Sequence, residues 1–230
     1  MAHLVIVGAG PGLSLSTARR FGAEGYDVTL LGRTRQRLDQ VAAELAADGV
    51  KAGVQVADAT DHAGLRRVLT DVNAASTVDV CVFQPGTRAD ELVDVRAATV
   101  DNVRPNLELL VLGAVAMGEA LLPAMTERGA GALLFVGGGS ARLALPAFGN
   151  LGMAMSGLRN YAMTLHKALS GSGVYAGFLT VAGMIATARA GKDEIDPAGL
   201  ADRAWRMVTD GHEPEVLMTA GGEIPVKSSR

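Results

Sequence analysis

The chain has 230 residues and a formal net charge of −3 at pH 7, with hydrophobic residues making up 49% and aromatic residues 4% of the sequence. This length and composition suit one α/β domain over residues 1–230, with a core of aliphatic side chains. The charge argues against nucleic acid or an anionic membrane surface as a partner, and the uncharged stretch 143–158 falls short of the ~20 apolar residues of a membrane span. The one cysteine, Cys81, excludes a disulfide framework and favours a soluble, cytoplasmic protein.

Strand-like and helical stretches alternate along the chain. We predict strands at residues 4–7, 28–31, 53–56, 78–83, 132–136, 175–181 and 215–218. We predict helices at residues 13–24, 35–47, 63–75, 106–128, 147–169 and 197–208. Near-continuous apolar strands separated by helices are typical of a parallel sheet that is covered on both faces. The fold class is therefore α/β: a single-domain, Rossmann-like, doubly wound parallel sheet of about seven strands with helices on both faces.

Capping residues mark the expected helix ends. Thr34 and Asp61 precede two of the helices as N-caps, and Asp196 precedes a helix that opens with proline. Helices are expected to stop at three glycines: Gly25, Gly49 and Gly129.

The densest cluster of glycines follows the first strand, where Gly8, Gly10 and Gly12 fall within five positions. Glycine permits a positive φ and lets the backbone come close to a ligand. The next helix begins at Leu13 and Ser14, and its N-terminus offers unpaired N–H groups to a phosphate. A strand, a glycine turn and a helix in this order predict a dinucleotide site.

The residues after the second and third strands indicate which dinucleotide binds. In such folds an acidic residue after the second strand binds the ribose 2′-hydroxyl, whereas an arginine accommodates a 2′-phosphate. Gly32 takes the acidic place and Arg33 follows it, so NADP(H) is favoured over NAD(H); the alternative is a solvated arginine that opens a helix. Asp58, after the third strand, either meets the adenine or is a turn residue.

Together these segments resemble the short-chain dehydrogenase/reductase family over nearly the whole chain. Gly8 and Gly12 match the glycine turn of that family, with Ser14 replacing its third glycine, and the segments 83–86, 121–125 and 181–187 resemble its later motifs. The resemblance implies that the cofactor is bound by Gly8, Gly10, Gly12, Leu13, Ser14, Arg33, Asp58, Ala59, Gly86, Gly183, Ile185 and Thr187.

The catalytic positions that the resemblance implies are occupied by unsuitable residues. In the family a tyrosine passes a proton to the substrate, a lysine lowers the pKa of that tyrosine, a serine holds the substrate oxygen and an asparagine orders the proton relay. Without a gap in the alignment, these places fall on Leu151, Met155, Gly138 and Leu110. None of the four can exchange a proton, so the standard reaction is not expected.

Other polar residues near the same cleft are candidate proton sources. Ser140 lies two residues beyond the serine position, and Gln84 and Arg88 flank the rim; each is otherwise a turn or surface residue. Tyr161 lies ten residues beyond Leu151, ~15 Å along a helix, and is read as a packing residue. The histidines His3, His62 and His212 have no metal-ligand spacing, so no metal is expected.

The apolar residues at and near the catalytic positions allow two interpretations of the cleft. Leu110, Leu151 and Met155, with Phe148 and Met153, would make the proton-transfer site apolar. Such a cleft suits a small apolar molecule, or else an inactive site has filled with core-like residues.

Three functions stay open. The first is an NADP(H)-binding protein without standard carbonyl reduction, and the second is an atypical NADPH-dependent oxidoreductase with a non-standard proton source. The third is a non-redox cyclase or isomerase of a biosynthetic pathway. By the resemblance, the helices at 106–128 and 147–169 imply a homodimer or homotetramer, and a hetero-oligomer with an active paralogue would also account for the lost site.

Overall fold

The computed structural model describes residues 1–87, 91–186, 191 and 193–226. Its main sheet has eight strands in the order β10-β9-β6-β5-β4-β1-β2-β3, and a separate pair is formed by β7 and β8. The strands are β1 His3–Val7, β2 Asp27–Gly32, β3 Ala52–Val56, β4 Val80–Phe83, β5 Gly131–Gly138, β6 Val174–Val181, β7 Met184–Ile185, β8 Glu194–Ile195, β9 Glu215–Thr219 and β10 Gly222–Ile224.

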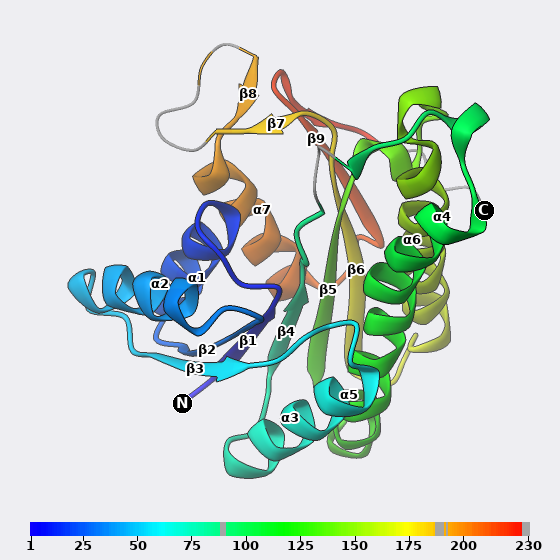
Figure 1. The fold of residues 1–230 in the computed structure, drawn as a ribbon. Coiled ribbons are helices and arrows are strands. Elements are labelled where there is room, and N and C mark those ends of the chain that lie inside the picture. The colour runs from blue at the N-terminus through cyan, green and yellow to red at the C-terminus, as the bar shows by residue number, and fades with distance from the viewer. Residues whose placement is uncertain (88–90, 187–190, 192, 227–230) are drawn as a thin grey trace.

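Helices cover both faces of this sheet (Figure 1). The α-helices are α1 Leu13–Ala23, α2 Arg35–Ala47, α3 His62–Ala75, α4 Val100–Asn106, α5 Gly113–Arg128, α6 Gly149–Ala168 and α7 Pro197–Asp210. A π-helical segment, η3 Leu107–Leu112, joins α4 to α5, and short 3₁₀ turns are η2 Val95–Ala97, η4 Gly139–Ala141 and η5 Pro146–Phe148.

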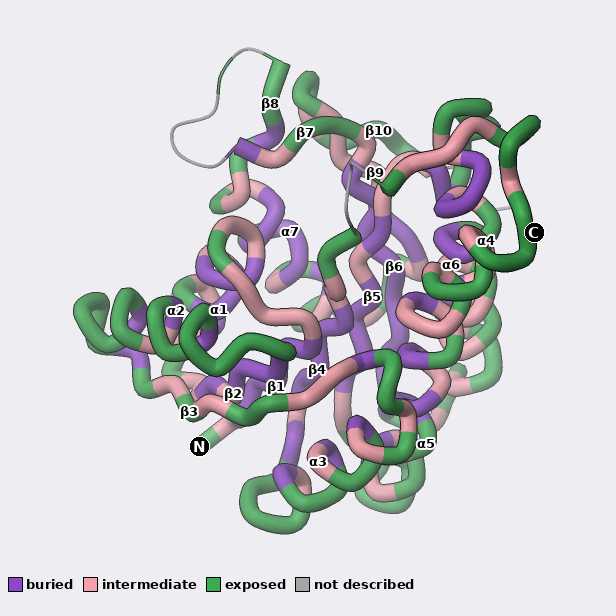
Figure 2. The backbone as a smooth tube through the Cα atoms, in the orientation of Figure 1, coloured by how far each residue is buried: buried purple, intermediate pink, exposed green. Residues whose placement is uncertain are grey.

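The seven predicted strands are confirmed, because β1 to β6 and β9 run parallel in one sheet. The eighth strand, β10, pairs antiparallel with β9 through a hairpin and was not predicted. Two core layers follow from the alternation of strand side chains. One is packed with α3, α5 and α6 and contains Phe83, Phe135 and Phe178; the other is packed with α1, α2 and α7 and contains Phe21. Figure 2 shows the central strands as the buried part of the molecule.

The predicted start of the fourth helix at residue 106 was wrong. The helix begins at Val100, where the Thr99 hydroxyl accepts a hydrogen bond from the Asn102 N–H and the Asn102 side chain accepts one from the Thr99 N–H. This capping box ends the extended chain six residues earlier than predicted. Pro105 lies inside the helix, which continues into the π-helical segment rather than beginning there.

The continuous helix Val100–Arg128 is long and apolar enough to cross a membrane, by length and composition only, with a mean hydropathy of 1.8 in its most apolar window. In this fold 44% of that window is buried. Residues Leu110, Met117 and Leu121 of the helix belong to the core layer under the sheet. A core helix passes the same test of length and composition, so the helix is accounted for by the fold.

The predicted helix ends agree with the structure at most positions. Asp61 and Asp196 each accept hydrogen bonds from the first turn of their helices. Thr34 occupies the N-cap position of α2, but its side chain makes no capping hydrogen bond. Gly129 ends α5 in the left-handed region, with φ 67°.

Candidate functional site: a cleft at the carboxyl edge of the sheet

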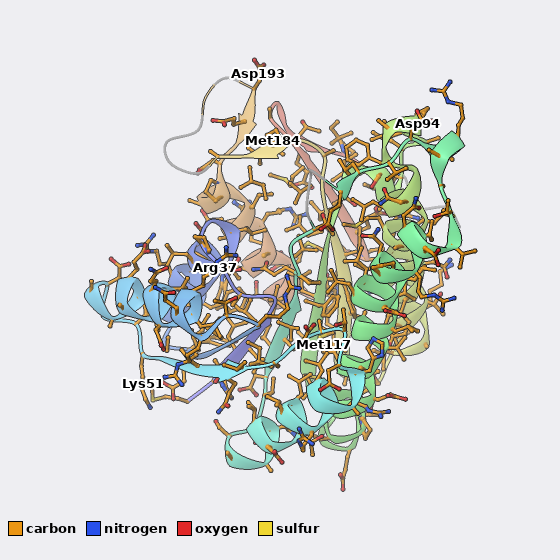
Figure 3. All side chains as sticks on the ribbon, viewed as in Figure 1. Arg37, Lys51, Asp94, Met117, Met184 and Asp193 are labelled. Atoms are coloured by element: carbon orange, nitrogen blue, oxygen red, sulfur yellow. The ribbon has the colours of Figure 1, made fainter. Side chains whose placement is uncertain are left out.

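A cleft of about 1320 Å³ lies along the carboxyl ends of β1, β2, β4, β5 and β6. The strands β3 and β4 lie on opposite sides of β1 in the sheet, and the chain crosses over between them, so the strand order reverses at this point. Open α/β sheets bind ligands at such a reversal. Figure 3 shows two side chains of its lining, Arg37 from α2 and Met184 from β7. The cleft therefore has one half near β2 and another near β5 and β7.

The glycine turn forms the floor of the first half. Gly8 and Gly12 have φ values of 86° and 87°, which only glycine adopts readily. A Cβ on Gly8 would collide with the backbone of Pro85, whereas a Cβ on Gly10 or Gly12 would have nothing within 4 Å. Gly12 also precedes α1 without any side-chain cap, so the first N–H groups of that helix stay available to a ligand. The turn is shaped for close approach by an anion.

Two arginines stand where β2 meets α2. Arg33 and Arg37 both line the cleft and are exposed. The intervening Arg35 is engaged elsewhere, because its Nε donates to Asp39 at 2.8 Å. Within the described residues the guanidinium of Arg37 has no hydrogen bond or ion pair. Sequence reasoning missed Arg37, although it lies one helical turn after Arg33.

Asp58 is held in a local turn beside this half. Its Oδ1 accepts hydrogen bonds from the Thr60 N–H at 2.9 Å and the Thr60 hydroxyl at 2.8 Å. Burial raises the pKa of the Asp58 carboxyl, but the Thr60 bonds and the charge of Arg33 outweigh it, so the pKa is lowered overall. The neighbouring Ala59 lines the cleft, and Asp58 itself is not among the lining residues.

A polar pair crosses the middle of the cleft. Gln84, after β4, donates from Nε2 to the Ser14 hydroxyl of α1 at 2.6 Å. The Oε1 atom of Gln84 is buried and has no hydrogen-bond partner among the described residues. A buried acceptor without a partner costs about 1–3 kcal/mol. Since both residues line the cleft, the orphaned oxygen is a candidate contact for a bound molecule.

The second half of the cleft is apolar. Leu151 and Met155 line it from α6 and are only 5% and 6% exposed. The Met155 sulfur accepts a weak hydrogen bond from the Gly138 N–H at 3.5 Å. A Cβ on Gly138 would have nothing within 4 Å, whereas one on Gly137 would lie 2.5 Å from Phe178 Cζ. The space of a serine side chain at Gly138 is therefore open.

Further apolar side chains extend this half towards solvent. Leu143, Leu145 and Met184 line the cleft and are 55%, 39% and 73% exposed. Phe148 lies among them, as predicted, and is half-buried. The prediction that Met153 lies in this half was wrong, because its side chain is 50% exposed and lies outside the cleft lining. It is two residues from both Leu151 and Met155 on α6, so its side chain leaves the helix on a different side.

The other predicted residues fall into three groups. The cleft lining includes the predicted residues Gly8, Gly10, Gly12, Leu13, Ser14, Arg33, Ala59, Gln84, Gly86, Gly138, Ser140, Leu151, Met155, Gly183 and Ile185. Arg88 and Thr187 lie outside the described residues. Leu110 is fully buried in the core, and its neighbour Leu109 lines the cleft instead.

Ionisable side chains are scarce in this cleft. Among the described residues that line it, only Arg33 and Arg37 carry an ionisable group. Tyr161 does not reach it; its phenol lies against Gly118 of α5 and its ring packs edge-on against Phe135, with centroids 5.7 Å apart. Burial raises the pKa of the Tyr161 phenol, with a further contribution from the charge of Glu119.

A buried carboxylate fixes the turn that carries Ser140. The Glu215 side chain is 1% exposed and accepts hydrogen bonds from Arg142 and Arg159, each at 2.6 Å, and from the Thr180 hydroxyl at 3.1 Å. Burial raises the pKa of Glu215, but the two arginines outweigh it, so the pKa is lowered overall. Arg142 follows η4 directly, and the ion pair therefore ties that turn to β9.

Comparison with known proteins decides the family. Residues 2–197 match the model of the short chain dehydrogenase family. The chain belongs to this family. An uncharacterized oxidoreductase of Streptomyces coelicolor is 31% identical over 172 residues, which cover 74% of this chain and 68% of that protein. Galactitol 2-dehydrogenase (L-tagatose-forming) of Cereibacter sphaeroides is 31% identical over 159 residues, covering 68% of this chain and 60% of that enzyme.

Solved structures share the fold of this short chain dehydrogenase. The L-sorbose reductase of Gluconobacter frateurii, complexed with NADPH and L-sorbose, superimposes with a TM-score of 0.86 at 20% identity over 98% of this chain and 97% of that one. An alcohol dehydrogenase of the archaeon Thermococcus sibiricus, complexed with 5-hydroxy-NADP, gives a TM-score of 0.83 at 19% identity over 99% and 100% of the two chains. At these identities the likeness establishes the shared fold.

Proposed function

We propose that the protein binds NADP(H) in the cleft. The glycine turn leaves open space over Gly10 and Gly12 beside the uncapped start of α1, which suits a pyrophosphate. Arg33 and Arg37 present two exposed cations where a 2′-phosphate is expected. The fold is shared with a reductase whose structure holds NADPH and with an alcohol dehydrogenase whose structure holds 5-hydroxy-NADP. The bound nucleotide would supply a hydride at its nicotinamide ring.

We further propose that the protein does not reduce carbonyls by the family's tyrosine-dependent route. The observation that supports this is the lining of the second half of the cleft, which contains Gly138, Leu151 and Met155. The family resemblance aligns these three residues with the serine, tyrosine and lysine of the standard route. Arginine does not give up its proton at physiological pH. Within the described lining, the hydroxyl and amide groups that remain are weak acids. A general acid contributes about 10²–10⁴-fold to such reactions.

The test separates binding from turnover. A fluorescence titration with NADPH is expected to give saturable binding, while NADPH oxidation across a broad panel of ketones and aldehydes stays at the rate without protein. Turnover of an ordinary carbonyl at normal enzymatic rates would refute the proposal. Failure of NADPH to bind would refute its first part, irrespective of turnover.

A second function is favoured by the apolar extension of the cleft. Leu143, Leu145 and Met184 are exposed apolar side chains in the cleft lining, and apolar cleft surfaces bind hydrophobic small molecules. The protein would then be an atypical NADPH-dependent oxidoreductase acting on an apolar substrate. Ser140 and Gln84 are the described candidates for polar contact with that substrate, and single Ser140→Ala and Gln84→Met variants test each role by the change in kcat/KM.

A further inference from the structure

The apolar half of the cleft constrains which hydride acceptor it can serve. When a hydride adds to a neutral carbonyl, an alkoxide and a cationic nicotinamide are created together. Charge that appears in a poorly solvated site is costly unless a donor or counter-charge is placed beside it. The side chains at the proton-transfer positions are an aliphatic group, a thioether and a glycine, from Leu151, Met155 and Gly138. Nothing in this set stabilises an alkoxide.

A cationic acceptor avoids this cost. Hydride addition to an iminium ion removes the charge from the substrate while one appears on the nicotinamide, so one positive charge moves and none is created. The side chains of this half are compatible with an organic cation, because Phe148 contributes an aromatic ring and Met155 and Met184 contribute polarisable sulfur. The two arginines of the described lining belong to the β2–α2 side, at the nucleotide half.

We propose that the substrate of this protein is an apolar iminium ion, a C=N⁺ group within a hydrophobic framework; the inference rests on the proposed NADP(H) binding. The hydride and its electron pair form a C–H bond at the iminium carbon, and the π pair of C=N⁺ becomes the nitrogen lone pair. NADPH is oxidised to NADP⁺ and the substrate is reduced to a tertiary or secondary amine. No proton is transferred, so the missing tyrosine and lysine are not needed.

The probe for this proposal is 2-methyl-3,4-dihydroisoquinolinium, whose nitrogen is permanently cationic, with neutral 1-tetralone as the ketone of matching shape. After subtraction of the reaction without protein, NADPH oxidation is expected to be at least about 100-fold faster with the cation than with the ketone. Its kcat is expected to be flat between pH 6 and 9, because no protein acid is consumed. Equal rates for both compounds, or a kcat that rises steadily on the acidic side, would overturn the proposal.

A binding experiment supplies a readout that does not depend on turnover. Calorimetry in the presence of 1,4,5,6-tetrahydro-NADPH, which has no hydride to give, is expected to show tighter binding of the cation than of 1-tetralone. Met184→Lys places a like charge in the lining at a 73%-exposed position that tolerates it, and is expected to weaken cation binding at least about fivefold. Met153→Lys is the matched control, because residue 153 is 50% exposed and lies outside the cleft lining, and it is expected to leave both affinities near wild type.

The outcomes distinguish the two proposals. If NADPH does not bind in the fluorescence titration, the proposed cofactor is wrong and the iminium assignment falls with it. If NADPH binds but the cation neither binds nor oxidises it, the iminium assignment alone is overturned. An equal loss of cation and ketone binding in Met184→Lys also counts against it, because a charge effect must discriminate between the two.

Discussion

The pair of arginines at the end of β2 gives the sharpest test of the cofactor proposal. Replacing Arg33 or Arg37 with alanine removes a charge-assisted contact to the 2′-phosphate, which is absent from NADH. Such contacts contribute about 1.5–3 kcal/mol, and because both arginines are exposed the lower end applies. Since about 1.4 kcal/mol corresponds to a factor of ten, each substitution is expected to raise the Kd for NADPH about tenfold.

The control lies between them in the sequence. Arg35 is similarly exposed but is paired with Asp39, so Arg35→Ala is expected to leave NADPH affinity within about twofold of wild type. The assay is a fluorescence titration with NADPH and NADH for each variant, at low and high ionic strength. The NADPH effect is expected to shrink with added salt, and NADH affinity is expected to stay unchanged. A parallel loss of NADH binding in Arg33→Ala and Arg37→Ala would refute the assignment of these residues to a 2′-phosphate.

Three further predictions concern stability and the middle of the cleft. Glu215→Gln removes the buried carboxylate that pairs with the partly exposed Arg142 and Arg159, and is expected to lower the free energy of unfolding in urea by about 1.5–3 kcal/mol at pH 7. The folded-state pKa of Glu215 is lowered, so its contribution to stability is present above the unfolded pKa of about 4.3 and is lost as pH falls through the folded value. The difference in stability between wild type and variant is therefore expected to narrow in acid. Gly137→Ser is expected to lower the free energy of unfolding by about 1–3 kcal/mol, because the new side chain overpacks against Phe178. Gly138→Ser is the control and is expected to keep the wild-type Tm, because its Cβ would meet nothing within 4 Å. An equal loss of stability in both variants would contradict the packing argument. Gln84→Met removes the amide oxygen that has no hydrogen-bond partner, so the free protein is expected to keep or gain stability. The rise in Tm on adding NADPH is expected to become smaller. A lower Tm of the free protein with an unchanged rise on adding NADPH would assign Gln84 a purely structural role.

The parts of the fold that the sequence predicted are those with a strong periodic signal. Seven strands and the helices between them were predicted because apolar runs alternate with helical patterns and capping residues mark several of the boundaries. The three-residue strand β10 has too little length for an alternating pattern, so it was missed. The start of α4 was misplaced by six residues, although the Thr99 and Asn102 pair that caps it is visible in the sequence.

The nucleotide half of the site was predicted for a different reason than the other half. A glycine turn has a fixed spacing, and Arg33 follows the strand directly, so both residue sets reach the cleft. In the other half, where a helix supplies the side chains, a shift of the helical register by one residue is enough to move a side chain from the cleft into the core. The π-helical segment Leu107–Leu112 makes this change, which places Leu109 in the cleft lining and Leu110 in the core. Ideal helical spacing gives no sign of it.

The two halves of the cleft also differ in how readily substitution alters them. The nucleotide half is built from backbone: the positive φ of Gly8 and Gly12 and the free N–H groups of α1 belong to the fold itself. The second half depends on a few side chains, and here Leu151 and Met155 belong to a core layer with 5% and 6% exposure. Burying such an apolar side chain contributes about 1.5–3 kcal/mol. Restoring a phenol and an ammonium group at these positions would forfeit that burial and leave two polar groups in apolar surroundings, since the described lining near them offers no carboxylate partner. The present side chains therefore stabilise the fold, and under the proposed function they oppose a return to the tyrosine-dependent route by single substitutions.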